Sequence, residues 1–161
     1  MENEIRVGRA PARRETDGEP LLIVDDLRTE FAVAAGAVKA VDGVSFELFR
    51  GRTLGVVGES GSGKTVLSRS IMGLNTSANA STTGSVLYAG DELIGKTSKE
   101  KKVLWGAEMA MVFQDPMTSL NPVVTIGRQL TEHVRYHLEM GKKEAEEVAV
   151  ALLQSVHIPE A

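Results

Sequence analysis

The residues that point most directly to chemistry form one glycine-rich segment, GESGSGKT, at positions 58–65. Its pattern, G-x-x-x-x-G-K-[ST], is typical of a loop that holds the phosphates of a nucleotide. Glycines allow the backbone to curl with positive φ, and the curled backbone directs its N–H groups toward an anion. A lysine can reach the outer phosphates, and a hydroxyl can complete the Mg²⁺ shell. The segment therefore predicts binding by Gly58, Glu59, Ser60, Gly61, Ser62, Gly63, Lys64 and Thr65, with Thr65 also a metal ligand.

The elements on either side of this segment suit the same chemistry. Residues 53–57 are expected to form a strand that leads into Gly58, and residues 64–72 a helix whose positive N-terminal end faces the loop. The alternative is a glycine-rich strand-to-helix turn that matches the pattern by chance. For a chain of this length, that chance is on the order of one in a hundred. Pattern and context together favour phosphate binding.

Apolar alternation and turn residues predict the remaining elements. We expect a short edge strand at residues 21–24, a second strand at 44–49 and a helix at 98–105 that Ser98 caps. Apolar residues recur every four positions over residues 126–138 and predict a helix, which Gly141 ends. Residues 145–156 predict another helix. The other expected elements are a loop at 75–83, a strand at 85–88 and a buried strand at 109–113.

Composition excludes several classes of protein. The 161 residues are 42% hydrophobic and 25% charged, as is typical of one soluble globular domain. The absence of cysteine excludes a disulfide framework, and the formal charge of −4 gives no basic footprint for nucleic acid. No apolar run approaches the length that spans a bilayer. Residues 1–20 are rich in Arg, Glu and Asp and lack the apolar segment of a signal peptide, so we expect a disordered tail there.

Three segments together resemble the ATP-binding subunits of ABC importers. They are AVDGVSF at 40–46, followed by Gly51 and the phosphate loop; IMGL at 71–74; and MVFQDPMTSLNP at 111–122. The third is the most specific and resembles the Q-loop segment of the oligopeptide, dipeptide and nickel branch. The resemblance covers the chain from residue 21 to its end. This family usually closes its loop with Lys-Ser, whereas this chain has Lys64-Thr65, and both pairs carry a hydroxyl for Mg²⁺.

The resemblance implies an α/β fold, namely a P-loop NTPase of ABC type with an N-terminal antiparallel β-subdomain. It implies one ATP-binding domain over residues 21–161, whose helical part starts at about residue 114. The implied activity is ATP hydrolysis with Mg²⁺ that drives import of peptides or nickel. The implied partners are the transmembrane subunits of a permease, a second ATP-binding subunit and, indirectly, an external substrate-binding protein. The chain would then lie peripherally on the cytoplasmic face of the membrane.

The resemblance also suggests roles for two residues outside the phosphate loop. In this family the Q-loop glutamine, here Gln114, contacts Mg²⁺ or the attacking water and links the nucleotide to the helical part. The alternative is a turn residue whose amide caps the loop backbone. The family also stacks adenine on an aromatic residue upstream of the phosphate loop, and Phe31 is the nearest candidate. A phenylalanine of the sheet core is an equal alternative for Phe31.

Several parts of a complete ABC ATPase do not occur in this sequence. It holds no Leu-Ser-Gly-Gly-Gln-like signature, and no apolar strand ending in Asp-Glu or switch histidine follows the phosphate loop. We therefore expect the N-terminal portion of a subunit, truncated before the signature and Walker B. The main alternative function is a nucleotide-binding module or fragment that does not hydrolyse ATP. A small-molecule kinase is a third possibility, against which the segment at 111–122 argues.

One pair of aspartates and one pair of histidines could be mistaken for metal sites. Asp25 and Asp26 follow an apolar run as in Walker B, but they precede the phosphate loop, so we expect them in a turn after an edge strand. His133 and His137 have the spacing of a zinc pair, but Val134 stands where H-E-x-x-H needs glutamate. We expect them to be an exposed pair of helix histidines.

Overall fold

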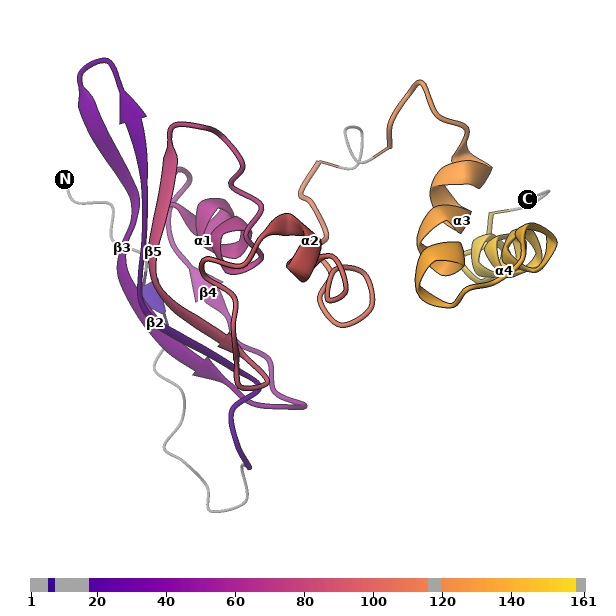
Figure 1. The fold of residues 1–161 in the computed structure, drawn as a ribbon, viewed down its shortest axis with the longest axis horizontal. Helices are drawn as coiled ribbons and strands as arrows, with labels where there is room; N and C mark the ends of the chain where they lie inside the picture. Colours follow the sequence, from indigo (N-terminus) through magenta and orange to yellow (C-terminus); the bar gives the residue numbers. More distant parts are fainter. Residues whose placement is uncertain (1–5, 8–17, 116–119, 159–161) are drawn as a thin grey trace. The chain divides into compact units, whose positions relative to one another are not determined.

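The computed structural model of the chain describes residues 6–7, 18–115 and 120–158. The chain divides into two compact units, Met1–Glu100 and Lys101–Ala161 (Figure 1). The phosphate-loop segment belongs to the first unit. The predicted start of a helical part, near residue 114, falls within the second.

Four antiparallel strands form the main sheet of the first unit, in the order β3-β2-β5-β6. β2 (Leu22–Val33) and β3 (Gly36–Leu48) make a long hairpin, and β5 (Ala80–Tyr88) pairs along the other edge of β2 (Figure 1). The two-residue strand β6 (Asp91–Glu92) pairs with the end of β5. This sheet confirms the antiparallel β-subdomain that the family resemblance implied.

β2 is longer and more central than the edge strand predicted at residues 21–24. Asp25 and Asp26 do not end the strand but form a β-bulge, where Asp26 has φ 43° and the register with both neighbouring strands shifts. Beyond the bulge, Leu27 and Thr29 are buried again. A bulge inserts one extra residue and so reverses the inward and outward alternation. A strictly alternating pattern therefore ends at Val24 in the sequence, although the strand continues.

β3 and β5 are also longer than expected. β3 begins at Gly36 rather than at residue 44, and β5 begins at Ala80, inside the loop expected at residues 75–83. Thr82 and Thr83 of β5 pair with Thr29 and Arg28 of β2. Threonine suits a pleated surface, but a polar run shows no periodicity that would distinguish a strand from a loop.

The strand that leads into the phosphate loop is short. We predicted residues 53–57, whereas β4 comprises Val56–Val57 and pairs antiparallel with β1 (Arg6–Val7). β1 lies within the stretch predicted to be a disordered tail, so that prediction is wrong for these two residues. Residues 1–5 and 8–17 of the expected tail lie outside the described residues.

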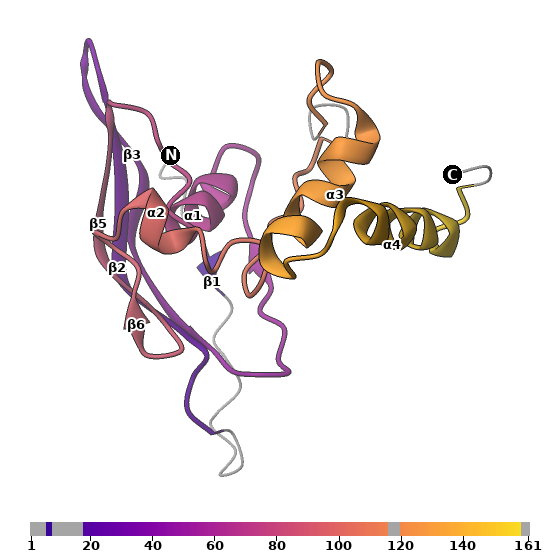
Figure 2. The ribbon, with the colours of Figure 1, turned by 45° about the vertical axis from the view of Figure 1, so that its right-hand side comes forward.

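α1 (Lys64–Ile71) agrees with the predicted helix and packs against β2 and β3 on one face of the sheet (Figures 1 and 2). Its two buried residues are Leu67 and Ser70. The other buried apolar side chains of this unit come from the sheet and the turn after it, so the core lies between the helix and the strands. These side chains are Leu22, Val24, Leu27, Val41, Val44, Val86 and Leu93.

The predicted helix at residues 98–105 is a single turn, α2 (Ser98–Lys101). Thr97, not Ser98, caps it. The backbone N–H of Glu100 donates to Thr97 Oγ1 at 3.3 Å, and the Glu100 carboxylate accepts from the Thr97 N–H at 2.8 Å. This reciprocal pair is a capping box.

The second unit contains two packed helices, α3 (Ile126–His137) and α4 (Lys142–Ser155), as predicted. Their shared core consists of Thr131, Val134, Ala145 and Ala149. The Gln129 side chain holds the chain just before α3, because its amide bonds to both backbone groups of Asn121 and donates to the Val124 carbonyl oxygen at 2.7 Å.

The buried strand predicted at residues 109–113 is wrong. Met109 makes an isolated bridge to Trp105, and residues 110–113 have no strand conformation. Val112 is 96% exposed. An apolar run becomes a strand only beside another strand that takes up its backbone hydrogen bonds, and the sequence pattern contains no information about that partner.

Among the helices of the described residues, none is both long and apolar enough to cross a membrane.

Candidate functional site

The segment between β4 and α1 forms a tight loop whose shape depends on glycine. Gly61 has φ 82° and Gly63 has φ 94°, values that L-residues with a side chain rarely adopt. Gly63 is the N-cap of α1, and its carbonyl oxygen accepts the first helical hydrogen bond from the Leu67 N–H at 2.8 Å. The two glycines therefore turn the chain directly into the helix.

Gly58 closes the other end of the loop. A Cβ atom added there would lie 2.5 Å from the Oγ of Ser62, which is itself 94% buried within the loop. The Ser62 N–H donates to the Glu59 carbonyl oxygen at 3.2 Å. The first and fifth positions of the segment are therefore in direct contact, and any side chain at position 58 would force them apart.

Lys64 extends back across this loop. Its ammonium donates to the carbonyl oxygens of Gly58 at 2.8 Å and Glu59 at 2.6 Å, and to Ser62 Oγ at 3.3 Å. All three donors of the ammonium are used. The positive charge is thus held at the centre of the curled backbone, where a bound phosphate would also lie.

The N-terminal end of α1 carries no counter-charge of its own. Its first turn contains no acidic residue, and its N-cap residue, Gly63, makes no side-chain hydrogen bond to the helix. The basic residue Arg69 lies in the last turn. Helix N–H groups and the helix dipole therefore leave a positive end beside Lys64. Thr65 is exposed in the first turn. The Lys64 ammonium, the curled backbone and the exposed Thr65 form a set of groups that fits a nucleoside triphosphate with Mg²⁺.

The other two predicted site residues lie outside the phosphate-loop segment, and their roles stay predictions. Gln114 is an exposed bend residue of the second unit, at the start of a segment whose residues 116–119 lie outside the described part of the chain. Phe31 belongs to the first unit, where it is half-buried on β2 between Val38 and Ala80. It is neither a buried core residue nor fully exposed, so both interpretations of Phe31 stay open.

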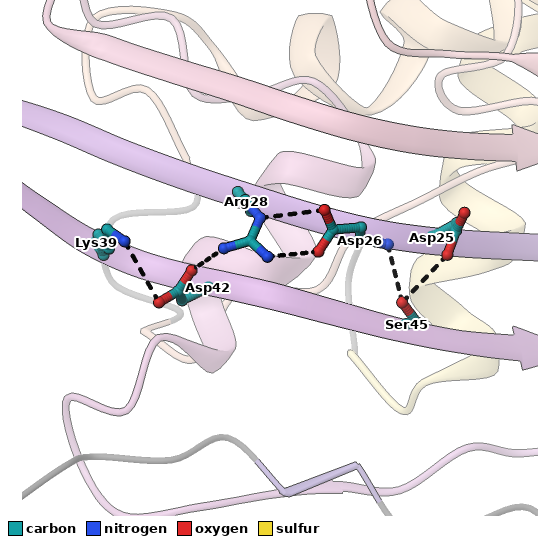
Figure 3. A network of polar contacts seen from close by, with 6 residues as sticks. All are labelled: Asp25, Asp26, Arg28, Lys39, Asp42 and Ser45. Carbon is teal, nitrogen blue, oxygen red and sulfur yellow. Dashed lines mark hydrogen bonds and ion pairs between the residues drawn. The ribbon is translucent and has the colours of Figure 1, made fainter.

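Asp25 and Asp26 take part in a surface network rather than in a metal site (Figure 3). The Arg28 guanidinium donates to both oxygens of Asp26, at 2.7 and 3.2 Å, and also to Asp42. These bonds hold the pKa of the Asp26 carboxyl below its usual value and raise the pKa of Arg28. The Ser45 hydroxyl donates to Asp25 at 3.4 Å and accepts from the Asp26 N–H at 2.9 Å.

Among the described residues, the histidine pair has no further possible metal ligand beside it. His133 is exposed as expected, but His137 is half-buried, with its ring edge-on to Tyr136 at 4.9 Å between centroids. Its Nε2 would lie 3.2 Å from a Cβ added at Gly106. Among the described residues, no group of three or more His, Cys, Asp or Glu side chains could hold a metal ion.

A buried polar cluster where α1 meets β2 had no counterpart among the predicted site residues. Thr29 on β2 and Ser70 on α1 are 0% and 1% exposed, and their hydroxyl oxygens lie 2.7 Å apart. Ser70 lies within the helix predicted at residues 64–72, but nothing in the local pattern marks it as buried. Thr29 carried no signal, because a polar residue beyond the expected end of a strand predicts exposure.

Comparison with known proteins agrees with this geometry. Residues 41–160 match the family described as ABC transporter. The chain is 44% identical over 143 residues to the dipeptide transport ATP-binding protein DppD of Bacillus subtilis. It is 45% identical over 141 residues to the oligopeptide transport ATP-binding protein OppD of Salmonella typhimurium. Each alignment covers 88% of this chain, but 43% of DppD and 42% of OppD. The chain therefore spans about two fifths of the length of these relatives.

Proposed function

Because the chain belongs to the ABC transporter family, we propose that its phosphate loop binds ATP with Mg²⁺, and that hydrolysis of this ATP in the whole protein drives import of peptides. The observation that carries the proposal is the closed loop from Gly58 to Thr65, with the Lys64 ammonium at its centre. The names of the similar proteins support peptides as cargo. Nickel is the alternative that remains from the branch resemblance.

The residues of the loop would act by binding and orienting the nucleotide. The N–H groups of the curled backbone would donate to phosphate oxygens, and Lys64 would exchange its carbonyl partners for the outer phosphates. The Thr65 hydroxyl would ligate Mg²⁺, which supplies charge neutralisation when bound. Gln114 would contact Mg²⁺ or the attacking water, and Phe31 would stack on adenine.

The partners of the whole protein follow from the same proposal. They are the transmembrane subunits of a permease, a second ATP-binding subunit and, indirectly, an external substrate-binding protein. The chain would then act at the cytoplasmic face of the membrane as a peripheral subunit. ATP-binding subunits that are named for peptide transport support this arrangement.

Nucleotide titration of a Lys64→Ala variant tests the proposal. We expect the unchanged chain to bind ATP with Mg²⁺, and the variant to bind it between about tenfold and a hundredfold more weakly, because hydrogen bonds from a charged group contribute about 1.5–3 kcal/mol. Lys143→Ala, which removes an exposed lysine from α4, is the matched control and should leave the affinity unchanged. Equal affinities of the Lys64→Ala and unchanged chains would contradict the proposal.

Nucleotide binding without hydrolysis is the second candidate, because a phosphate loop by itself accounts for binding of the nucleotide and not for activation of the attacking water. Phosphate release distinguishes the two functions when it is measured on the natural gene product with its partner chains. Steady turnover that Lys64→Ala abolishes supports the ATPase. Tight ATP binding without turnover under every condition supports the binding module. The intact mass of the natural gene product, compared with 17.3 kDa for this chain, shows which protein the phosphate-release measurement should use.

A further inference from the structure

A continuous chain of hydroxyl groups connects the helix behind the phosphate loop to the sheet. Thr29 Oγ1 lies 2.7 Å from Ser70 Oγ and 3.3 Å from Thr82 Oγ1, so the chain runs from β5 through β2 to α1. Asn75, which follows α1, also donates to Ser70 Oγ, at 2.8 Å. Thr29 and Ser70 are almost fully buried, so water is not available to replace these partners.

The hydrogen-bonding capacity of a hydroxyl fixes the direction of this chain. Ser70 donates its one proton to the Val66 carbonyl oxygen at 2.7 Å and receives the Asn75 amide. Ser70 can therefore only accept from Thr29, so Thr29 is the donor of the 2.7 Å bond. Thr29 can in turn accept from Thr82. Donor and acceptor are then assigned in each hydrogen bond of this series of hydroxyl groups. Removal of the Thr29 hydroxyl would leave Ser70 without one of its partners.

These hydroxyl groups lie at the C-terminal end of the helix whose N-terminal end follows the phosphate loop. Leu67 and Ser70 are the two buried residues of α1, so Ser70 provides the polar half of its attachment to the sheet. Ser70 lies six residues after Lys64, which is about 9 Å along a rigid helix. Beyond Ser70, Gly73 has φ 66° and its N–H donates to the Ser70 carbonyl oxygen at 3.0 Å, which ends the helix. The helix is thus held at its C-terminal turn and free to present Lys64 and Thr65 at the other end.

We propose that Thr29 and Ser70 are positioning residues for the phosphate loop. Their hydrogen bond determines where α1 sits on the sheet, and hence where Lys64 and Thr65 meet the phosphates of a nucleotide. The proposal rests on the proposed function for the identity of the ligand. It goes beyond that function by assigning part of the nucleotide affinity to a strand residue and a helix residue that meet at the far end of α1.

Substitution of Thr29 by valine tests this role, because valine keeps the shape of threonine and removes its hydroxyl. We expect Thr29→Val to weaken ATP affinity about fivefold, as the loss of one hydrogen bond of about 1 kcal/mol predicts. The ³¹P resonance of the bound β-phosphate should shift, and so should the amide resonances of Gly63, Lys64 and Thr65 in the chain without nucleotide. Thr29→Ser should restore the affinity and the resonances. Thr83→Val, at an exposed threonine of β5, is the matched control and should change none of them.

The outcomes separate a positioning role from a merely structural one. If Thr29→Val lowers the melting temperature but leaves ATP affinity and the loop amide resonances unchanged, the inference is wrong. Ser70→Ala provides a second test should the valine variant not fold, because alanine favours the helix, and it should change the same resonances. If the unchanged chain binds no ATP, the proposed function fails, while the loop amide resonances still decide whether Thr29 and Ser70 position the loop. Both measurements use the natural gene product.

Discussion

At the scale of single residues, the phosphate loop depends on side chains of its own segment and on a buried pair of hydroxyl groups that lies outside it. Gly58, Lys64 and Thr65 could be identified because their pattern is local, and each has one chemical purpose at a fixed spacing. Thr29 could not be identified, because its partner Ser70 lies 41 residues further along the chain. A buried hydroxyl leaves no periodic signal in the sequence. The roles of Gln114 and Phe31 came from family resemblance and stay predictions.

Glu92 is a further residue whose importance arises from tertiary contacts. Its carboxylate accepts from Ser85 Oγ at 2.5 Å, from the Val86 N–H at 2.9 Å and from the Ile94 N–H at 2.8 Å. Partial burial raises the pKa of Glu92, but these hydrogen bonds together outweigh burial and hold the pKa below its usual value of 4.5. The ionised form therefore stabilises the attachment of β6 to β5 and the backbone at Ile94.

The pH dependence of a Glu92→Gln variant tests this account. Because the folded pKa is lowered, the stabilisation is fully present above the unfolded pKa of 4.5 and is lost as pH falls through the folded pKa. We expect the variant to unfold with a free energy lower by about 1–3 kcal/mol near neutral pH, and the difference to shrink below pH 4.5. Urea unfolding over this range measures it. Asp91→Asn, on an exposed neighbour, is the control; a difference that grows toward acid pH would contradict the prediction.

At the scale of elements, helices were easier to predict than strands. α1, α3 and α4 carry their own 3.6-residue apolar periodicity, so the sequence predicts them without knowledge of their neighbours. β2 and β5 were predicted too short, because their outer halves are polar or contain a bulge. Residues 109–113 were predicted as a strand that the structure lacks. Strand formation depends on a partner at a distant position, which a local pattern does not specify.

The β-bulge in β2 makes one glycine of the neighbouring strand necessary. Gly84 on β5 has φ 101°, and a Cβ added there would lie 2.4 Å from the backbone oxygen of Asp26 and 2.8 Å from that of Asp25. Backbone atoms cannot move aside as a flexible side chain can. The sheet can therefore hold the bulge at Asp25 and Asp26 only while position 84 lacks a side chain.

Gly84→Ala should accordingly destabilise the first unit by about 3 kcal/mol, through backbone strain and the steric clash together. Gly90→Ala is a matched control, because Gly90 also has positive φ, 90°, but has open space around its Cβ position. Strain alone should cost the control about 1 kcal/mol. Denaturant unfolding of both variants checks the difference, and equal losses of stability would show that the bulge does not depend on Gly84.

At the scale of the whole molecule, the two units differ in how much apolar surface they bury. The first has eight buried apolar side chains among its described residues, from Leu22 to Leu93, whereas the second has Val134, Ala145 and Ala149. Large apolar side chains of the second unit remain exposed, including Leu138 at 62% and Leu152 at 55%. On α4, Ala145 and Ala149 are therefore buried, whereas Leu152 is uncovered.

This difference predicts that the second unit of the 161-residue chain opens before the first. Burial of each large apolar side chain contributes about 1.5–3 kcal/mol, and two of the three buried apolar residues in the second unit are alanines. We expect amide hydrogens of α3 and α4 to exchange with a free energy of opening at least about 2 kcal/mol below that of β2 and β5. Native-state hydrogen exchange in low urea measures both sets in one sample. Exchange of all four elements with the same free energy and the same urea dependence would mean that the two units unfold as one, and the prediction would then be wrong.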